Sequence, residues 1–132
     1  MNKRLGNSFE AEFCQMLAEN GFWAHNLTQN SAGQPADVIA VKNGVAHLID
    51  CKLCTGNSFS VSRIEENQRY AMHLWSDCGN GLGWFAIRIN GMVYMVTLSQ
   101  LEESDKKRLS EDWLSDHGIS FENWVVSQCA SP

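Results

Sequence analysis

The sequence predicts an α/β fold in which β-hairpins alternate with amphipathic helices. Asn43-Gly44 and Asn90-Gly91 each separate two runs rich in apolar and β-branched residues. This pattern favours a hairpin with a two-residue type I′ turn, because both turn residues tolerate positive φ. Apolar residues of 8–19 repeat at helical spacing. The chain has 132 residues, the size of one ordinary domain, so we expect a single domain over residues 1–132.

The first element is an amphipathic helix over residues 8–19. Its apolar stripe ends at Asn20-Gly21, which supplies a stop signal. Residues 22–36 are rich in Gly, Ser, Asn and Gln, so a loop is expected there, with a short strand at 22–24.

The most regular segment of the chain runs from the first hairpin to a second helix. Strands are predicted over 37–42 and 45–52, and a third strand is expected over 58–61. Ser62-Arg-Ile-Glu65 has the pattern of a capping box, which predicts a helix that begins at Ser62 and ends before Gly79.

The C-terminal part begins with the second hairpin, whose strands are expected over 84–89 and 92–98. A last helix is predicted over about 104–115. We therefore expect a core over about 4–98 and a C-terminal helical extension over about 99–126.

Composition limits the classes of function. Ten Lys and Arg against fifteen Asp and Glu give a net charge of −5, so any nucleic-acid site must be a local basic patch. No apolar run approaches the roughly 18 residues that a membrane span needs, and the N-terminus lacks the apolar run of a signal peptide. A cytoplasmic protein without membrane association is expected. The five cysteines are irregularly spaced, which is typical of reduced thiols.

A charged face is predicted on the first hairpin. With a two-residue turn, the numbers of directly opposed residues sum to 87, so Asp37 lies opposite Asp50. Alternation along the strand places Lys52 on the same face as Asp50. Two adjacent carboxylates repel each other and need a cation, and their hard oxygens suit Mg²⁺ or Mn²⁺. Taken singly, Asp37 could be a turn residue and Lys52 a solvated edge charge.

The same alternation argues against a metal or redox site at the C-x-x-C formed by Cys51 and Cys54. Cys51 projects to the face opposite Asp50, towards the core, and no second ligand pair supports a zinc site. His47 shares this core face, so we expect it to be structural.

Three short motifs together resemble the PD-(D/E)XK nuclease superfamily. They are Pro35-Ala-Asp37, Asp50-x-Lys52 and a helix that carries Gly6-Asn-Ser-Phe-Glu10. Within it the chain looks like the Holliday-junction resolvases of archaeal type and the RecU-type resolvases of bacteria and phages. The resemblance covers about residues 4–98. It implies a restriction-endonuclease-like core, with a central mixed β-sheet flanked by helices.

The resemblance also implies roles for individual residues. Asp37 and Asp50 match the two metal-binding acids, Glu10 the helix-borne acid that helps to position the metal, and Lys52 the catalytic lysine. Gln68 matches a glutamine on the second helix of RecU-type members. The implied cofactor is Mg²⁺, for which Mn²⁺ could substitute, and the implied reaction is metal-assisted hydrolysis of a DNA phosphodiester bond.

The implied partner is branched DNA, most simply a four-way junction, whose two-fold symmetry implies a homodimer. Four cations beside the motifs are candidate phosphate contacts: Lys3, Arg4, Arg63 and Arg69. Ser31 falls in the loop where archaeal members carry a serine near the scissile phosphate.

Alternatives remain open at the level of the sequence. Glu10 could close a capping box with Asn7, and Gln68 could be an ordinary solvated helix residue. The enzyme could act on flaps, single strands or duplex DNA, or the fold could be a catalytically silent module that binds DNA or protein. Two features depart from the family pattern: the net charge is −5, whereas family resolvases are commonly basic, and Asp50 stands in place of Glu in the Asp50-x-Lys52 motif. The run Lys106-Lys-Arg108 belongs to no motif. Aromatic residues of the last third, such as Trp113, are expected mostly in the core.

Overall fold

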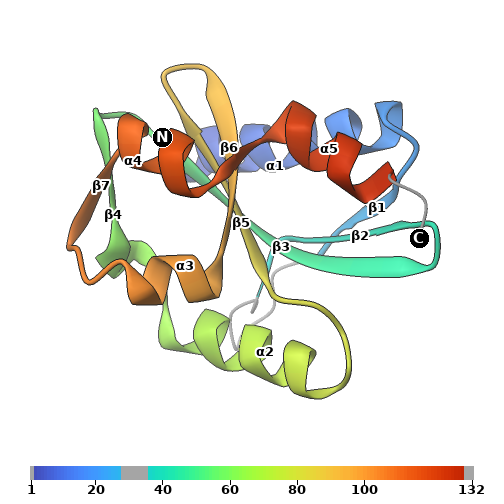
Figure 1. Cartoon of the computed structure of the whole chain (residues 1–132). Helices are drawn as coiled ribbons and strands as arrows, with labels where there is room; N and C mark the ends of the chain where they lie inside the picture. The colour runs from blue at the N-terminus through green and yellow to red at the C-terminus, as the bar shows by residue number, and fades with distance from the viewer. Residues whose placement is uncertain (1, 28–35, 130–132) are drawn as a thin grey trace.

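The protein is built around a six-stranded mixed β-sheet (Figure 1). The computed structural model describes residues 2–27 and 36–129, with side chains described for 9–27 and 36–128. The strand order is β1-β2-β3-β5-β6-β8, in which β3 and β5 are parallel and the other neighbours antiparallel. A separate two-stranded ribbon joins β4 and β7. The strands are β1 (Trp23–Asn26), β2 (Val38–Lys42), β3 (Val45–Cys54), β4 (Ser58–Ser60), β5 (Trp84–Ile89), β6 (Met92–Thr97), β7 (Arg108–Ser110) and β8 (Ile119–Ser120).

Helices cover both faces of the sheet. The helices are α1 (Asn2–Glu19), α2 (Glu66–Asp77), α3 (Leu98–Glu103), α4 (Glu111–His117) and α5 (Phe121–Cys129), with a 3₁₀ turn at Val61–Arg63. Helices α1 and α5 lie on one face, and α2 and α3 on the other (Figure 1). The expected central mixed sheet flanked by helices is confirmed. None of the described helices is both long and apolar enough to cross a membrane.

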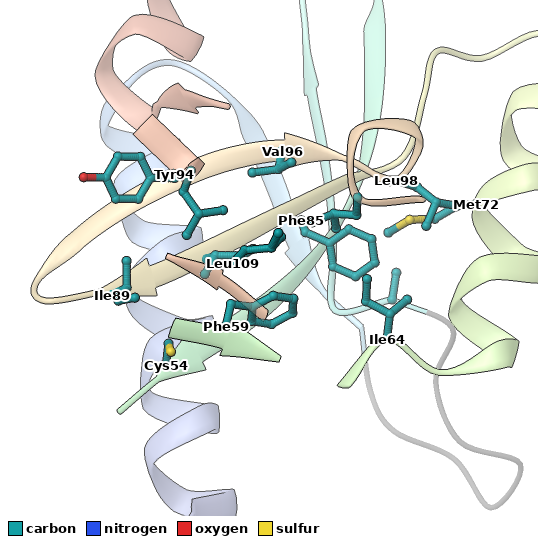
Figure 2. Close-up of a cluster of buried hydrophobic side chains, with 14 of the residues drawn as sticks. Cys54, Phe59, Ile64, Met72, Phe85, Ile89, Tyr94, Val96, Leu98 and Leu109 are labelled. Carbon is teal, nitrogen blue, oxygen red and sulfur yellow. The ribbon is translucent and has the colours of Figure 1, made fainter. Parts of the chain in front are cut away.

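Each face of the sheet has its own hydrophobic cluster. The cluster under α1 and α5 contains Phe9, Phe13, Leu17, Phe22, Ile49, Cys51, Met95, Phe121 and Trp124, among others. The cluster on the opposite face includes Cys54, Phe59, Ile64, Met72, Phe85, Ile87, Ile89, Leu98 and Leu109, most of which Figure 2 labels. Successive β3 side chains alternate between the two faces, as the pleat of a strand requires.

Both hairpins form as predicted. The pairs from Val38↔Ile49 to Lys42↔Val45 all obey the sum of 87, without a bulge. Asn43 and Gly44 have φ of 53° and 77°, and Asn90 and Gly91 have φ of 50° and 79°, as type I′ turns require.

Two predicted boundaries in the first half were wrong. Helix α1 begins at Asn2 rather than at residue 8, so Asn7 lies inside the helix and is not its N-cap. The second helix does not begin at Ser62, because 61–63 forms a 3₁₀ turn. Glu65 is the N-cap of α2, and its capping box closes with Gln68. Burial of Ile64 beneath the sheet separates the 3₁₀ turn from α2.

The predicted helix over 104–115 was also wrong. Asp105 has a φ of 55°, which breaks a helix, and Leu109 is buried at the centre of β7. Helix α4 starts only after Ser110, whose hydroxyl accepts a hydrogen bond from the Trp113 backbone N–H at 3.1 Å. Residues 99–126 therefore contain two strands as well as helices, and β8 extends the central sheet beside β6.

His47 is structural, as predicted, and we expect it to make stability depend on pH. It is buried against the rings of Phe22 and Trp124, with ring centroids 6.2 and 5.2 Å away, and burial lowers its pKa. The unfolded chain therefore binds a proton at His47 near pH 6.5, at which the folded protein does not yet bind it. Acidification below about pH 6.5 should reduce the free energy of unfolding, by up to about 1.4 kcal/mol for each unit by which the folded pKa lies below the unfolded one.

The measurement compares urea denaturation midpoints at neutral and mildly acidic pH for wild type and His47→Gln, which cannot titrate. The decrease between the two pH values should be smaller in the variant. An equal decrease in both proteins would assign the acid sensitivity to other groups.

Candidate active site

Asp37 stands directly before β2, at the end of the first hairpin that lies away from its turn. Its backbone N–H donates to the Ile49 carbonyl at 3.1 Å, whereas the register of β2 and β3 places Ile49 opposite Val38, so the pairing at Asp37 departs by one residue from that register. Its carboxylate Oδ2 accepts a hydrogen bond from the Cys51 backbone N–H at 2.7 Å. The side chain is thereby held against β3, but the direct opposition to Asp50 that the sequence predicted is not part of the β2–β3 pairing, which starts at Val38.

Asp50, Lys52 and Gln68 form one buried network on the α2 face of the sheet. Lys52 Nζ lies 3.1 Å from Asp50 Oδ2, and the Asp50 and Lys52 side chains are only 2% and 12% exposed. Gln68 Nε2 donates to Asp50 Oδ1 at 3.2 Å, while Gln68 Oε1 accepts from Lys52 Nζ at 3.4 Å. Gln68 Oε1 also accepts from the Glu65 backbone N–H at 3.0 Å, which fixes the orientation of the amide.

Gln68 is therefore not a solvated helix residue. Its position follows from the shift of the helix start, because a cap at Glu65 makes Gln68 the third helical residue and turns it towards β3. The amide bridges the carboxylate and the lysine of the predicted Asp-x-Lys pair.

Glu10 reaches the same group of carboxylates from α1. Burial, the charge of Asp37 and a hydrogen bond with Asp37 raise the pKa of Glu10 to about 7, against the opposing effect of Lys52. Burial and the neighbouring Asp37 raise the pKa of Asp50 well above its usual range, again opposed by Lys52. Both pKa shifts thus arise first from burial and then from the closeness of three carboxylates, which a single lysine only partly offsets.

This donor set fits a divalent cation that prefers oxygen. In the parts of the chain that the structure describes, no three His, Cys, Asp or Glu side chains are arranged to enclose a metal ion on their own. Mg²⁺ does not need such a cage, because it usually binds one or two carboxylates and keeps waters or substrate phosphates as its other ligands. Asp37 and Asp50 are the two carboxylates available, with Glu10 beside Asp37.

The two cysteines of the C-x-x-C lie apart from each other in the fold. Cys51 and Cys54 are free and buried, and they belong to the clusters on opposite faces of the sheet. The Cys54 thiol donates to the Ser58 carbonyl at 2.9 Å. The contribution of Cys51 to the site is its backbone N–H, which no sequence pattern reveals.

The candidate DNA-contacting residues differ in what the structure says of them. Lys3 and Arg4 lie in α1, but their side chains are outside the described part, and Ser31 lies outside the described residues altogether. Arg69 forms ion pairs with Glu66 at 3.8 Å and Glu102 at 3.0 Å. Arg63 is exposed and donates to the Leu53 carbonyl at 2.9 Å, next to Lys52.

Almost the whole sequence matches the model of one protein family. The model of the archaeal Holliday junction resolvase (Hjc) family matches residues 1–130. The chain belongs to the Hjc family. No curated protein matches it by sequence.

The fold agrees with that of an Hjc family member. A solved structure of Hjc from Archaeoglobus fulgidus, described as a Holliday junction resolvase from an archaeal hyperthermophile, superimposes with a TM-score of 0.70 at 15% sequence identity. The alignment covers 92% of this chain and 98% of that chain. At this identity the likeness concerns the fold, and it supports the restriction-endonuclease-like core predicted from the motifs.

Proposed function

We propose that this member of the Hjc family is a metal-dependent endonuclease that resolves Holliday junctions. The observation that carries the proposal is the group of the buried Asp37 and Asp50 and the half-buried Lys52 at the end of the hairpin remote from its turn. Folding alone gives no reason to bring two carboxylates together in a protein interior, because each raises the cost of ionising the other. A site that binds a cation and a phosphate does give such a reason.

Asp37 and Asp50 would hold the metal, with Glu10 in support. When bound, Mg²⁺ or Mn²⁺ would lower the pKa of a water molecule and neutralise charge on the scissile phosphate. The hydrogen bond from the Cys51 N–H holds Asp37 in place, and the Gln68 amide holds Asp50. Both carboxylates are thus oriented by the rigid sheet and by α2 before any ligand arrives.

Lys52 would contact the phosphate and the attacking hydroxide. Its ammonium is restrained by Asp50 and Gln68, so its position is defined without substrate. A fixed positive charge in a partly buried site stabilises the additional negative charge of the transition state more strongly than it would in water.

The proposed assembly is a homodimer, because a four-way junction has two-fold symmetry and requires two cuts. Tyr70 and Leu74 lie one turn apart on α2 and are 71% and 49% exposed. Exposed apolar side chains at this spacing suit a contact between two copies of the helix.

A nuclease acting on flaps or plain duplex would use the same site residues, so substrate comparison must separate these functions. We expect wild type to cut a labelled four-way junction in Mg²⁺ or Mn²⁺ but not in EDTA, and to leave the matched duplex and flap intact. Lys52→Met keeps the apolar stem but loses the charge, and should reduce junction cleavage on the order of 10²-fold or more.

Circular dichroism of Lys52→Met at the assay temperature would control for its folding, since Asp50 loses its ion-pair partner. Equal cleavage of all three substrates would leave the chemistry but reject junction specificity. Binding of the junction without cleavage by wild type would instead indicate a silent binding module.

A further inference from the structure

The run Lys106-Lys-Arg108, which belongs to no motif, is brought by the fold beside Arg63. Strand β7 pairs with β4 in the register Ser58↔Ser110, Phe59↔Leu109 and Ser60↔Arg108. The Val61 backbone N–H donates to the Lys107 carbonyl at 2.9 Å, which extends the pairing past the strand ends. Four cations, one of them far from the others in sequence, therefore share one small structure, which we call the β4–β7 ribbon (residues 58–63 and 106–110).

The ribbon has an apolar and a polar side. Phe59 and Leu109 are fully buried and point into the cluster that contains Phe85 and Ile64 (Figure 2). Because alternate residues of a strand face opposite ways, Ser58, Ser60 and Arg108 lie on the other side. Arg108 Nε donates to Ser58 Oγ at 2.8 Å, which orients the guanidinium over the serine side of the ribbon.

The charge of the ribbon contrasts with that of the rest of the protein. Residues 58–63 and 106–110 contain four Lys or Arg and no acidic residue, whereas the remaining residues carry six Lys or Arg and all fifteen Asp and Glu. Glu111 follows the ribbon, but its carboxylate accepts hydrogen bonds from Asn90 at 2.8 Å and Tyr94 at 2.6 Å.

The cations of the ribbon are also unpaired, unlike others in the chain. Among the described residues, neither Arg63 nor any member of Lys106-Lys-Arg108 forms an ion pair, whereas Arg69 is paired with Glu102 and Arg88 with Glu12. All four ribbon cations are exposed. Unpaired cations interleaved with serine hydroxyls are among the groups that proteins commonly use to contact DNA phosphates.

The ribbon adjoins the candidate active site through Arg63. Strand β4 follows shortly after the end of β3 that carries Asp50 and Lys52, and Arg63 Nη1 donates to the Leu53 carbonyl at 2.9 Å. The Arg63 guanidinium also lies over the Phe59 ring, with its carbon 5.5 Å from the ring centroid. A DNA strand that places a phosphate at Lys52 can thus continue along the ribbon.

We propose that the β4–β7 ribbon binds the phosphate backbone of a DNA arm and so positions the junction at the active site. This inference rests on the proposed function. It assigns DNA affinity to a short basic surface on an acidic protein, which explains how a chain with a net charge of −5 can bind DNA.

The test is the salt dependence of junction binding, measured by fluorescence anisotropy in EDTA between about 50 and 200 mM salt. Log affinity falls linearly with log salt, and each lost phosphate contact should make this negative slope about 1 smaller in magnitude. The double variant Lys106→Gln/Lys107→Gln should therefore reduce the magnitude of the slope by about 2, and Arg108→Gln should reduce it by about 1. The double variant removes no side-chain hydrogen bond within the described structure and should keep the wild-type melting temperature.

Lys42→Gln is the matched control, because it removes one positive charge at the turn end of β2, the end remote from Asp37. It should leave the slope unchanged. If wild type binds and cuts the junction while the ribbon variants keep its slope and affinity, the ribbon is not a DNA site and the proposed function stands. If wild type neither binds nor cuts the junction, the proposed function fails and the inference fails with it.

Discussion

Replacing Asp50 by asparagine is expected to reduce junction cleavage on the order of 10³-fold or more, without loss of folding. The asparagine side chain keeps an oxygen that can accept the Gln68 hydrogen bond, but it lacks the charge that a metal ion requires. The substitution also relieves the repulsion between Asp50 and Asp37, so the free energy of unfolding should stay the same or increase. Single-turnover cleavage and urea denaturation measure the two effects.

Asp77→Asn serves as the control, because it makes the same chemical change at the exposed end of α2. Its cleavage rate should equal that of wild type. Wild-type cleavage by Asp50→Asn would exclude Asp50 as a metal ligand, whereas loss of both cleavage and folding would make the residue structural.

The largest expected effect on stability is at Trp124. This side chain of α5 is fully buried and contacts the rings of Phe22, His47, Trp84 and Phe121, with centroids between 5.2 and 6.2 Å away. Trp124→Ala should lower the free energy of unfolding by about 3–5 kcal/mol, because a large cavity would open in the cluster under α1 and α5. Such a loss is a large fraction of the total stability of a typical domain.

Val126 provides the control on the same helix, since it is 68% exposed. Val126→Ala should change the free energy of unfolding by less than about 0.5 kcal/mol. Urea denaturation of both variants is the measurement. A loss below about 1 kcal/mol for Trp124→Ala would mean that α5 contributes little to the core.

The sequence predicted the first hairpin because its register follows from a local turn. Asn43-Gly44 favours one turn geometry, and the sum of 87 then determines every opposed pair. The common face of Asp50 and Lys52 follows from alternation along β3, whereas Asp37 lies outside the paired residues and is held by its hydrogen bond from the Cys51 N–H.

Elements that depend on distant contacts could not be predicted in this way. Leu109 has the periodicity of a helix in its own segment, but pairing with Phe59, which is far away in the sequence, makes it part of a strand. The contact between Lys107 and Val61 has the same origin, so the sequence shows the run Lys106-Lys-Arg108 but not that it lies beside Arg63.

The candidate site combines contacts that follow from a local turn with contacts between residues distant in the sequence. Gln68 could be named only through the family resemblance, because the capping pattern at Ser62 put the start of its helix in the wrong place. The amide becomes part of the site because Ile64 is buried and Glu65 then caps α2. Neither effect can be predicted from the residues next to Gln68.

Whether the protein resolves junctions as a dimer can be measured on a supercoiled plasmid with an inverted repeat that extrudes as a cruciform. A single nick releases the supercoiling and reabsorbs the cruciform, so linear product requires two cuts within one binding event. We expect wild type in Mg²⁺ to convert the plasmid to linear DNA cut at the base of the cruciform, and Asp50→Asn to leave it supercoiled. Nicked circles alone, or cleavage of a plasmid without the repeat, would contradict a dimeric Holliday-junction resolvase.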